Sequence, residues 1–359
     1  MLRILESKLC HLLQIENPII QAGMAGGATT VDLLVGVSEA GGLATLGAAY
    51  MKPEDIRKTI KEVKSRVNKP FAVNLFCTTM DDNLTNLREV QSALNSFRQD
   101  LNITYGNSNI KTESLFDEQF QVLLDEKIPI ISTAFGHLST EKMQLAKERG
   151  IKVITMVTTV NEAILAEQAG SDVIVAQGSD AGGHRSTFDI NTFPNGANIG
   201  TFSLVPQVVD HVNVPVVAAG GIMDARGIVA SLALGAQGVQ MGTQFLTCKE
   251  SGIHPAYKDA LLQSNEESTV ITKSFSGRPA RGIKNKFISE FENLGIEPLP
   301  FPSQNTLTTD IRKAAAKQNN PDYMSLWAGQ ATRLQKGNIS AKQLICELMD
   351  EVKQMLGKM

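Results

Sequence analysis

The chain has 359 residues, of which 42% are hydrophobic and 20% are charged, a composition typical of globular proteins. Its 34 basic and 37 acidic side chains give a net charge of -3 without a long run of one sign, which argues against nucleic acid or a membrane surface as a partner. The four cysteines are widely spaced, no apolar window reaches about 18 residues, and residues 1–13 lack a signal-peptide pattern. We therefore expect a cytoplasmic protein without disulfides or a membrane span.

Eight short apolar or β-branched runs recur along the chain, with helix-like segments between them. Such alternation predicts parallel strands joined by helices. The first of these helices is expected to begin after Thr29 or Thr30 and to stop at Gly41, and the next to begin at Pro53. The runs lie at residues 17–23, 41–47, 70–76, 128–134, 151–157, 171–178, 214–221 and 236–243.

Eight such repeats predict a (β/α)8 TIM barrel, in which active-site groups gather at the carboxyl ends of the strands. A doubly wound open sheet is the competing fold, but the first strand leads into QAGMAGG and not into the G-x-G-x-x-G that this fold requires. Residues 81–115 and 247–329 exceed what a minimal barrel needs. We expect a barrel core over residues 1–246, a cap over the barrel mouth at 247–329, and a C-terminal helix within 330–359 that returns to the barrel.

The loops after the seventh and eighth runs each contain a glycine turn. The seventh run ends in Gly220-Gly221, with Asp224 as the expected N-cap of the next helix, and the eighth ends in Gly242-Thr243. In TIM barrels the backbone N–H groups of these two loops commonly bind phosphate. The pair therefore predicts a phosphomonoester site; the alternative is that both are only tight turns.

Amide side chains and one histidine complete the expected rim of the barrel. Asn74 and Gln177 can both donate and accept hydrogen bonds, which suits the edge of a flat heterocycle such as a flavin, although each could instead satisfy backbone at its strand end. His184 directly follows a Gly-Gly after the sixth run, so we predict that it is catalytic. His137, which follows the fourth run, is expected to be structural or to support the site. No metal site is expected, because the histidines are far apart in the sequence.

The motifs IIQAGMAGG, VNLF, AQGSDAGGH, AAGGI and QMGTQF, in this order, resemble those of the nitronate monooxygenase family, formerly called 2-nitropropane dioxygenases. The resemblance extends to WAGQ at 327–330, although no proline precedes Met24 and Asp180 replaces the more common glutamate. It implies FMN at the mouth of the barrel, a small nitronate such as propionate 3-nitronate as substrate, O2 as oxidant and nitrite as a product. His184 matches the family's active-site histidine, and its flavin-contacting positions are matched by Asn74, Gln177, Gly182, Gly220, Gln240, Met241, Gly242 and Thr243.

Other functions remain open from the sequence. Flavin-dependent enoyl-acyl-carrier-protein reductases and NAD(P)H:quinone reductases use the same scaffold. A phosphate-handling barrel without flavin should show a lysine or carboxylate at a strand end, and none is found; a non-catalytic flavin-binding protein would not need His184. The sequence also leaves open whether the loop from Ser276 to Arg281 binds an anionic substrate tail or only braces the cap, and whether the chain forms a homo-oligomer.

Overall fold

The computed structural model describes residues 7–106 and 110–358. Three parts of the segments discussed above lie outside the described residues. They are residues 1–6 of the N-terminal stretch, residues 107–109 of the first insertion, and residue 359 at the end of the C-terminal helix. Among the described residues, no helix is both long and apolar enough to cross a bilayer.

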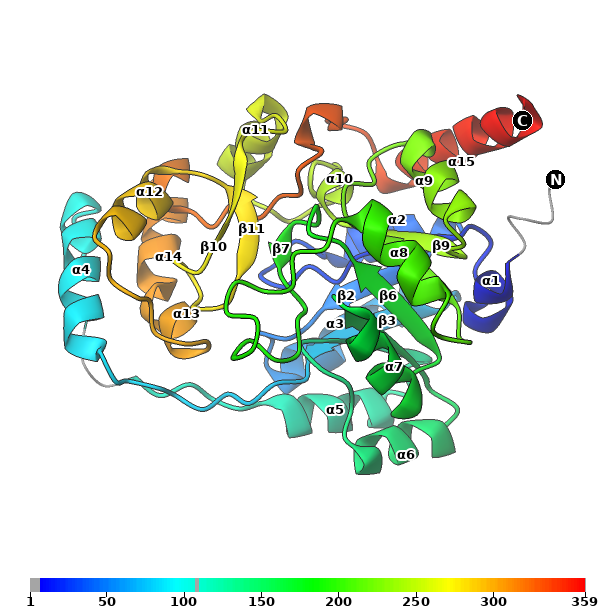
Figure 1. Ribbon diagram of the computed structural model, residues 1–359, viewed down its shortest axis with the longest axis horizontal. Coiled ribbons are helices and arrows are strands. Elements are labelled where there is room, and N and C mark those ends of the chain that lie inside the picture. Colours follow the sequence, from blue (N-terminus) through cyan, green and yellow to red (C-terminus); the bar gives the residue numbers. More distant parts are fainter. Residues whose placement is uncertain (1–6, 107–109, 359) are drawn as a thin grey trace.

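Eight parallel strands form a barrel in the order β1-β9-β8-β6-β5-β4-β3-β2 (Figure 1). Ile19 and Gln21 of β1 exchange backbone hydrogen bonds with Leu43, just before β2, so the two ends of this order meet. The (β/α)8 fold is therefore confirmed. The strands are β1 (Ile19–Gln21), β2 (Ala44–Gly47), β3 (Phe71–Phe76), β4 (Ile130–Ala134), β5 (Lys152–Val157), β6 (Val173–Gln177), β8 (Val216–Ala219) and β9 (Gly238–Met241).

Helices surround the barrel and begin at the expected signals. The Thr30 hydroxyl caps α2, Pro53 occupies the first turn of α3, and the Asp224 carboxylate caps α9. Their apolar faces pack on the outer faces of the strands. The helices between the strands are α2 (Val31–Glu39), α3 (Pro53–Arg66), α5 (Phe116–Asp125), α6 (Thr140–Glu148), α7 (Val160–Gln168), α8 (Thr201–Val209) and α9 (Ala225–Ala233).

The two terminal helices pack on different parts of this barrel. In α1 (Lys8–Leu13), Leu9 and Leu13 join the residues that fill the barrel interior, so α1 closes its amino-terminal end. The C-terminal helix α15 (Ala341–Lys358) lies against α2 and α9 and buries Leu344 and Leu348 there. Helix α1 therefore lies at the end of the barrel opposite to the mouth that the cap covers (Figure 1).

Two details of the sequence prediction were wrong or incomplete. The eighth strand was expected to reach residue 243, but it ends at Met241, and Thr243–Leu246 forms the short helix α10. The sequence also gave no sign of a second sheet, in which β7 (Gly183–His184) pairs with β11 (Ala280–Ile283), and β11 with β10 (Thr269–Thr272). This small antiparallel sheet joins the cap to the loop after β6.

The cap has its own hydrophobic core, to which both extra segments contribute. Phe97 of α4 packs on Phe287 with 4.8 Å between ring centroids, and Phe275 stacks on Phe287 at 4.4 Å. Figure 1 shows α4 carried away from the barrel to lie beside the later helices of the cap. The limits 1–246, 247–329 and 330–359 remain a prediction. The cap elements are α4 (Leu87–Asp100), α11 (Pro255–Gln263), α12 (Lys286–Asn293), α13 (Ser303–Leu307), α14 (Thr309–Lys317), and the 3-10 turns Pro321–Tyr323 and Thr332–Leu334.

Candidate active site

A cavity of about 530 Å³ lies at the carboxyl ends of the strands, between the barrel and the cap. Its floor consists of strand ends, and its roof comes from α14 and from residues 324–331. All the residues that the sequence assigned to the site line this one cavity: Asn74, Gln177, Gly182, His184, Gly220, Gln240, Met241, Gly242 and Thr243.

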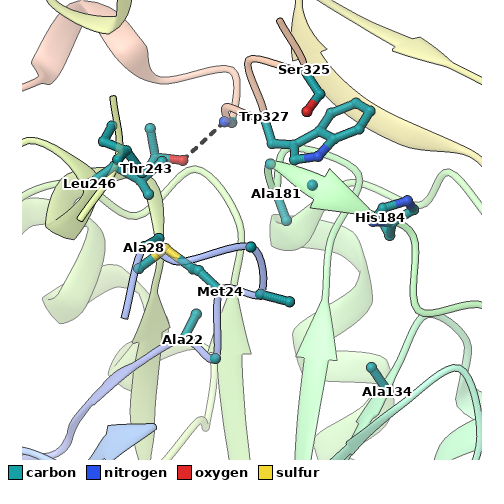
Figure 2. Close-up of a pocket in the computed structure, with 18 of the residues that line it drawn as sticks. Ala22, Met24, Ala28, Ala134, Ala181, His184, Thr243, Leu246, Ser325 and Trp327 are labelled. Carbon is teal, nitrogen blue, oxygen red and sulfur yellow. Dashed lines mark hydrogen bonds between the residues drawn. The ribbon is translucent and has the colours of Figure 1, made fainter. Parts of the chain in front are cut away.

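The walls of the cavity differ in character from one side to the other. Figure 2 shows Thr243 and Leu246 on one side and His184 on the other, with the Trp327 indole above them. Ala22 lies below, at the end of β1. The described lining is mainly apolar and glycine-rich, with a few amide and hydroxyl groups. Such a surface suits a flat, partly apolar ligand held at a few polar points.

The His184 ring is fixed from two directions. Its backbone pairs with Ala280 of β11, and its Nε2 lies 2.8 Å from the Ser276 hydroxyl. Ser276 donates its own hydroxyl proton to the carbonyl of Arg278, at 3.1 Å. Because that proton is already used, Nε2–H is the donor to Ser276, and Nδ1 is left with its lone pair. The sequence did not indicate Ser276 as the partner of this histidine.

Aromatic rings and buried cations keep the imidazole of His184 uncharged. The rings of Trp327, Phe135 and Phe301 lie 5.3, 5.8 and 6.3 Å from it, measured between centroids. Burial in this setting, together with the smaller effects of the nearby cations of Arg278 and Arg312, lowers the pKa of His184 to about 3. The side chain is therefore uncharged near pH 7.

The Gly-Gly before His184 has a clear structural reason. A Cβ on Gly182 would lie 2.5 Å from the backbone of Ala328, so only glycine lets the cap cross here. Gly183 has a φ of +76°, in the left-handed region that favours glycine. At Gly182 the close contact is therefore with the cap, and both glycines also line the cavity.

The three amide side chains differ in how many of their polar atoms already have hydrogen-bond partners. Gln177 is engaged at both ends, because its Nε2 donates to the His184 carbonyl and its Oε1 accepts from Ser186 N–H. Asn74 donates to the Ser132 hydroxyl, and Gln240 makes one weak contact with a methionine sulfur, so both keep their amide oxygens for a ligand. Gln177 thus supports the loop that carries His184, as well as lining the cavity.

The two glycine turns expected to bind phosphate both border the cavity. Gly220 and Gly221 have φ values of +116° and +70°, and a Cβ on Gly220 would lie 2.7 Å from the Thr201 hydroxyl. Across the cavity mouth, the Thr243 hydroxyl accepts a hydrogen bond from Gly329 N–H at 3.0 Å (Figure 2). The second turn therefore also holds the cap in place.

The loop from Ser276 to Arg281 braces the cap and does not line the cavity. The Arg278 guanidinium donates to the Thr187 carbonyl and stacks 3.9 Å above the Phe135 ring. Arg281 donates to the Ser179 carbonyl at 2.8 Å. Of the two readings left open by the sequence, the structure favours the bracing role.

Several polar residues that line the cavity were not predicted from the sequence: Tyr50, His254, Tyr257, Asn305, Arg312 and Ser325. Tyr50 follows the second strand and could have been found by the same strand-end argument that found Asn74. His254 and Arg312 belong to the cap, where no regular repeat predicts which side chain faces the barrel. His137, by contrast, hydrogen-bonds through Nδ1 to the Leu138 carbonyl and does not line the cavity.

Comparisons with known proteins find relatives that match nearly the whole chain. The family model described as "Nitronate monooxygenase" matches residues 6–351. A "Probable nitronate monooxygenase" from Staphylococcus haemolyticus is 43% identical over 351 residues, which cover 98% of each chain. The structure titled as nitroalkane oxidase from Streptomyces ansochromogenes superposes with a TM-score of 0.91 at 35% identity, covering 98% of this chain and 99% of that one. FabK from Thermotoga maritima superposes with a TM-score of 0.77 at 32% identity, covering 98% and 97%.

Proposed function

The chain belongs to the nitronate monooxygenase family, and we propose that it is an FMN-dependent enzyme that oxidises alkyl nitronates, of the propionate 3-nitronate type, with O2 to carbonyl products and nitrite. One observation carries this proposal: His184, held as a neutral base, faces the same cavity as every residue that the family resemblance assigns to the flavin. The described cysteines form no disulfide with one another, which agrees with the cytoplasm as its location.

The residues of the cavity fit an FMN. The free amide oxygens of Asn74 and Gln240 suit the polar edge of the ring system, and the turns at Gly220 and Gly242 suit its phosphate. Gly182, Met241 and Thr243 also line the cavity. When bound, FMN supplies the redox chemistry, by taking electrons from the substrate and passing them to O2.

His184 is suited to remove a proton from substrates that arrive as neutral nitroalkanes. Its Nδ1 carries a lone pair because Nε2–H is donated to Ser276. The low pKa keeps the imidazole uncharged near pH 7 and makes it a weaker base than a free histidine, so its contribution comes from its fixed position next to the substrate. A nitronate has already lost its α-proton and needs little base catalysis. The Trp327 indole and the Phe135 ring enclose this part of the site and limit access of water.

The test is nitrite release and O2 consumption by purified enzyme supplied with propionate 3-nitronate or with a neutral nitroalkane. We expect His184→Gln to lower nitroalkane turnover by about 100-fold or more, the usual contribution of a general base, and nitronate turnover much less. Full turnover of both substrates by this variant would overturn the role of His184. Absence of nitrite with every nitronate, combined with rapid oxidation of NADH or NADPH, would instead indicate a reductase.

A further inference from the structure

Residues 327–330, in the roof of the cavity, are bound to two other parts of the fold through their backbone. Ala328 N–H donates to the Arg281 carbonyl of β11 at 3.2 Å, and Gln330 N–H donates to the Asp180 carbonyl, in the loop after β6, at 3.0 Å. Both acceptors are backbone carbonyls. These two hydrogen bonds therefore need no ligand in the cavity.

A third hydrogen bond of this segment is different, because its acceptor is a side chain that lines the cavity. Gly329 N–H donates to the hydroxyl oxygen of Thr243 at 3.0 Å (Figure 2). Among the described residues, the hydroxyl proton of Thr243 has no acceptor. A hydroxyl group can accept one hydrogen bond while it donates another. Thr243 can therefore hold Gly329 and donate to a ligand in the cavity at the same time.

The ligand group expected beside Thr243 is the phosphate of FMN. Thr243 directly follows the Gly242 turn at the end of β9, and the Gly220 turn follows the neighbouring strand β8. The oxygens of a dianionic phosphate are acceptors, so the phosphate takes the hydroxyl proton and leaves a lone pair of the hydroxyl oxygen to Gly329. The two hydrogen bonds then form one chain, in which each strengthens the other.

The contacts of Gly329 connect this chain to the wall of the site that contains His184. A Cβ on Gly329 would lie 2.8 Å from the Asp180 carbonyl oxygen and 3.4 Å from the Thr243 hydroxyl, so the segment has little room to move while Thr243 is fixed. Two residues earlier, the Trp327 indole lies 5.3 Å from the His184 ring, measured between centroids. The position of Thr243 therefore bears on the ring that covers His184.

We propose that Thr243 couples binding of the FMN phosphate to closure of residues 327–330, so that the loaded cofactor fixes the wall that Trp327 forms beside His184. The proposal rests on the proposed function, from which it takes FMN as the cofactor, and adds how the site is closed. Thr243 is then a positioning residue, which acts on His184 through the cap. Riboflavin has the same ring system without the phosphate, so it should occupy the cavity without fixing this segment.

Hydrogen–deuterium exchange of the peptide that contains residues 327–330 tests this coupling without turnover. The peptide is followed in the flavin-free protein and at saturating FMN or riboflavin, with binding of each flavin checked by its absorbance. We expect the amides of Ala328, Gly329 and Gln330 to exchange about threefold to tenfold more slowly with FMN than with riboflavin, in line with the strengthening of one hydrogen bond. Equal protection by the two flavins would overturn the proposal, and so would failure of FMN to bind.

Substitutions at Thr243 show whether its hydroxyl carries the coupling. Thr243→Val keeps the shape of the side chain and removes the hydroxyl, so at saturating FMN it should lose the extra protection. Thr243→Ser keeps the hydroxyl and should retain the protection. Full protection by FMN in Thr243→Val, or its loss in both variants, would contradict a role of the hydroxyl.

Tyr257→Phe is the matched control, because it removes a hydrogen bond to the same segment that does not involve Thr243. The Tyr257 hydroxyl donates to the Trp327 carbonyl. This variant should exchange faster with either flavin and keep the difference between FMN and riboflavin; loss of that difference would also contradict the coupling. A protein that shows the coupling but oxidises no nitronate would disprove only the proposed function, and nitronate oxidation without the coupling would disprove only this inference.

Discussion

His184 combines three properties that one histidine in a sequence does not reveal. It is enclosed by aromatic rings, it donates Nε2–H to Ser276, and its pKa is far below that of a free imidazole. Each property comes from a residue distant in the chain. Together they keep the imidazole uncharged near pH 7 and in one orientation.

The lowered pKa predicts a measurable effect on stability. Between pH 6.5 and pH 3 the folded protein holds His184 neutral while the unfolded chain protonates it, so the unfolded state binds more protons and stability falls as the pH falls. Relative to His184→Gln, the wild type should lose about 2 kcal/mol of unfolding free energy between pH 7 and pH 5. Urea unfolding of both proteins at the two pH values measures this. Equal losses in the two proteins would show that His184 titrates normally.

Ser276 is expected to act by positioning His184. Replacing it with alanine removes the acceptor of Nε2–H and frees the ring to rotate and change tautomer. We predict that Ser276→Ala lowers kcat/KM for a neutral nitroalkane by about tenfold, with a much smaller effect for the nitronate, which needs no base. Ser289→Ala, in α12 of the cap, is the matched control. Equal losses for both substrates would mean that Ser276 only supports the cap.

The sequence identified site residues where a regular rule placed them and failed elsewhere. His184 and Asn74 could be found because the carboxyl ends of parallel strands converge at one mouth. Gln177 was found by the same rule, but its hydrogen bonds to the next loop could not be foreseen. No sequence pattern identified Arg312 as a residue of the site, because its position depends on how the cap folds back over the barrel.

At the scale of elements, the short strand β7, which contains His184, is joined to the cap by strand pairing. Its pairing with β11 fixes His184, and Trp327–Gln330, here called the strap, crosses directly over Gly182. The strap is bound on both sides of this crossing. Ala328 N–H donates to the Arg281 carbonyl at 3.2 Å, and Gln330 N–H donates to the Asp180 carbonyl at 3.0 Å. The strap can therefore pack here only if residue 182 is a glycine.

Two alanine substitutions separate the roles of the paired glycines. Gly182→Ala should displace the strap, because its Cβ would meet the Ala328 backbone at 2.5 Å. Gly183→Ala meets open space and should cost only about 1–2 kcal/mol for its positive φ. Gly357→Ala, in open space at the end of α15, is the control. We predict a red shift of Trp327 fluorescence for Gly182→Ala alone; a shift of the same size in Gly183→Ala would contradict this account.

The regular elements were largely predictable, and the irregular ones were not. All eight strands were found, and Thr30, Pro53 and Asp224 mark helix starts as expected, because these signals are local. The last strand was predicted to extend two residues beyond its end at Met241, because no local signal separates Gly242-Thr243 from the strand. The pairing of β7 with β11 joins residues almost a hundred positions apart, and no local pattern encodes it.

At the scale of the whole molecule, the cap and barrel have separate hydrophobic cores. The cap core joins α4, which follows β3, to helices that follow β9. The sequence indicated both extra segments but not their association. Such packing depends on side chains more than 150 residues apart, such as Phe97 and Phe287, which are 4.8 Å apart between ring centroids.

Phe97→Ala tests whether the first insertion supports the roof of the site. The ring is buried, so its removal should cost about 3–5 kcal/mol and should expose the cap to proteolysis. Phe202→Ala, at a residue that is 74% exposed on α8, should change stability by less than about 0.5 kcal/mol. Limited proteolysis and thermal unfolding compare the two. Unchanged cap digestion in Phe97→Ala would contradict a shared cap core.

The central claim, that this chain is an FMN-dependent nitronate monooxygenase, is tested most directly by anaerobic reduction of the purified protein. Propionate 3-nitronate is added to one sample, and NADH or NADPH to others, while the flavin absorbance is followed. The account predicts bleaching by the nitronate and release of nitrite once air is admitted. Rapid bleaching by a reduced nicotinamide, without any by the nitronate, would contradict it and assign the chain to the reductases. A colourless protein that neither FMN nor FAD reconstitutes would contradict the flavin site itself.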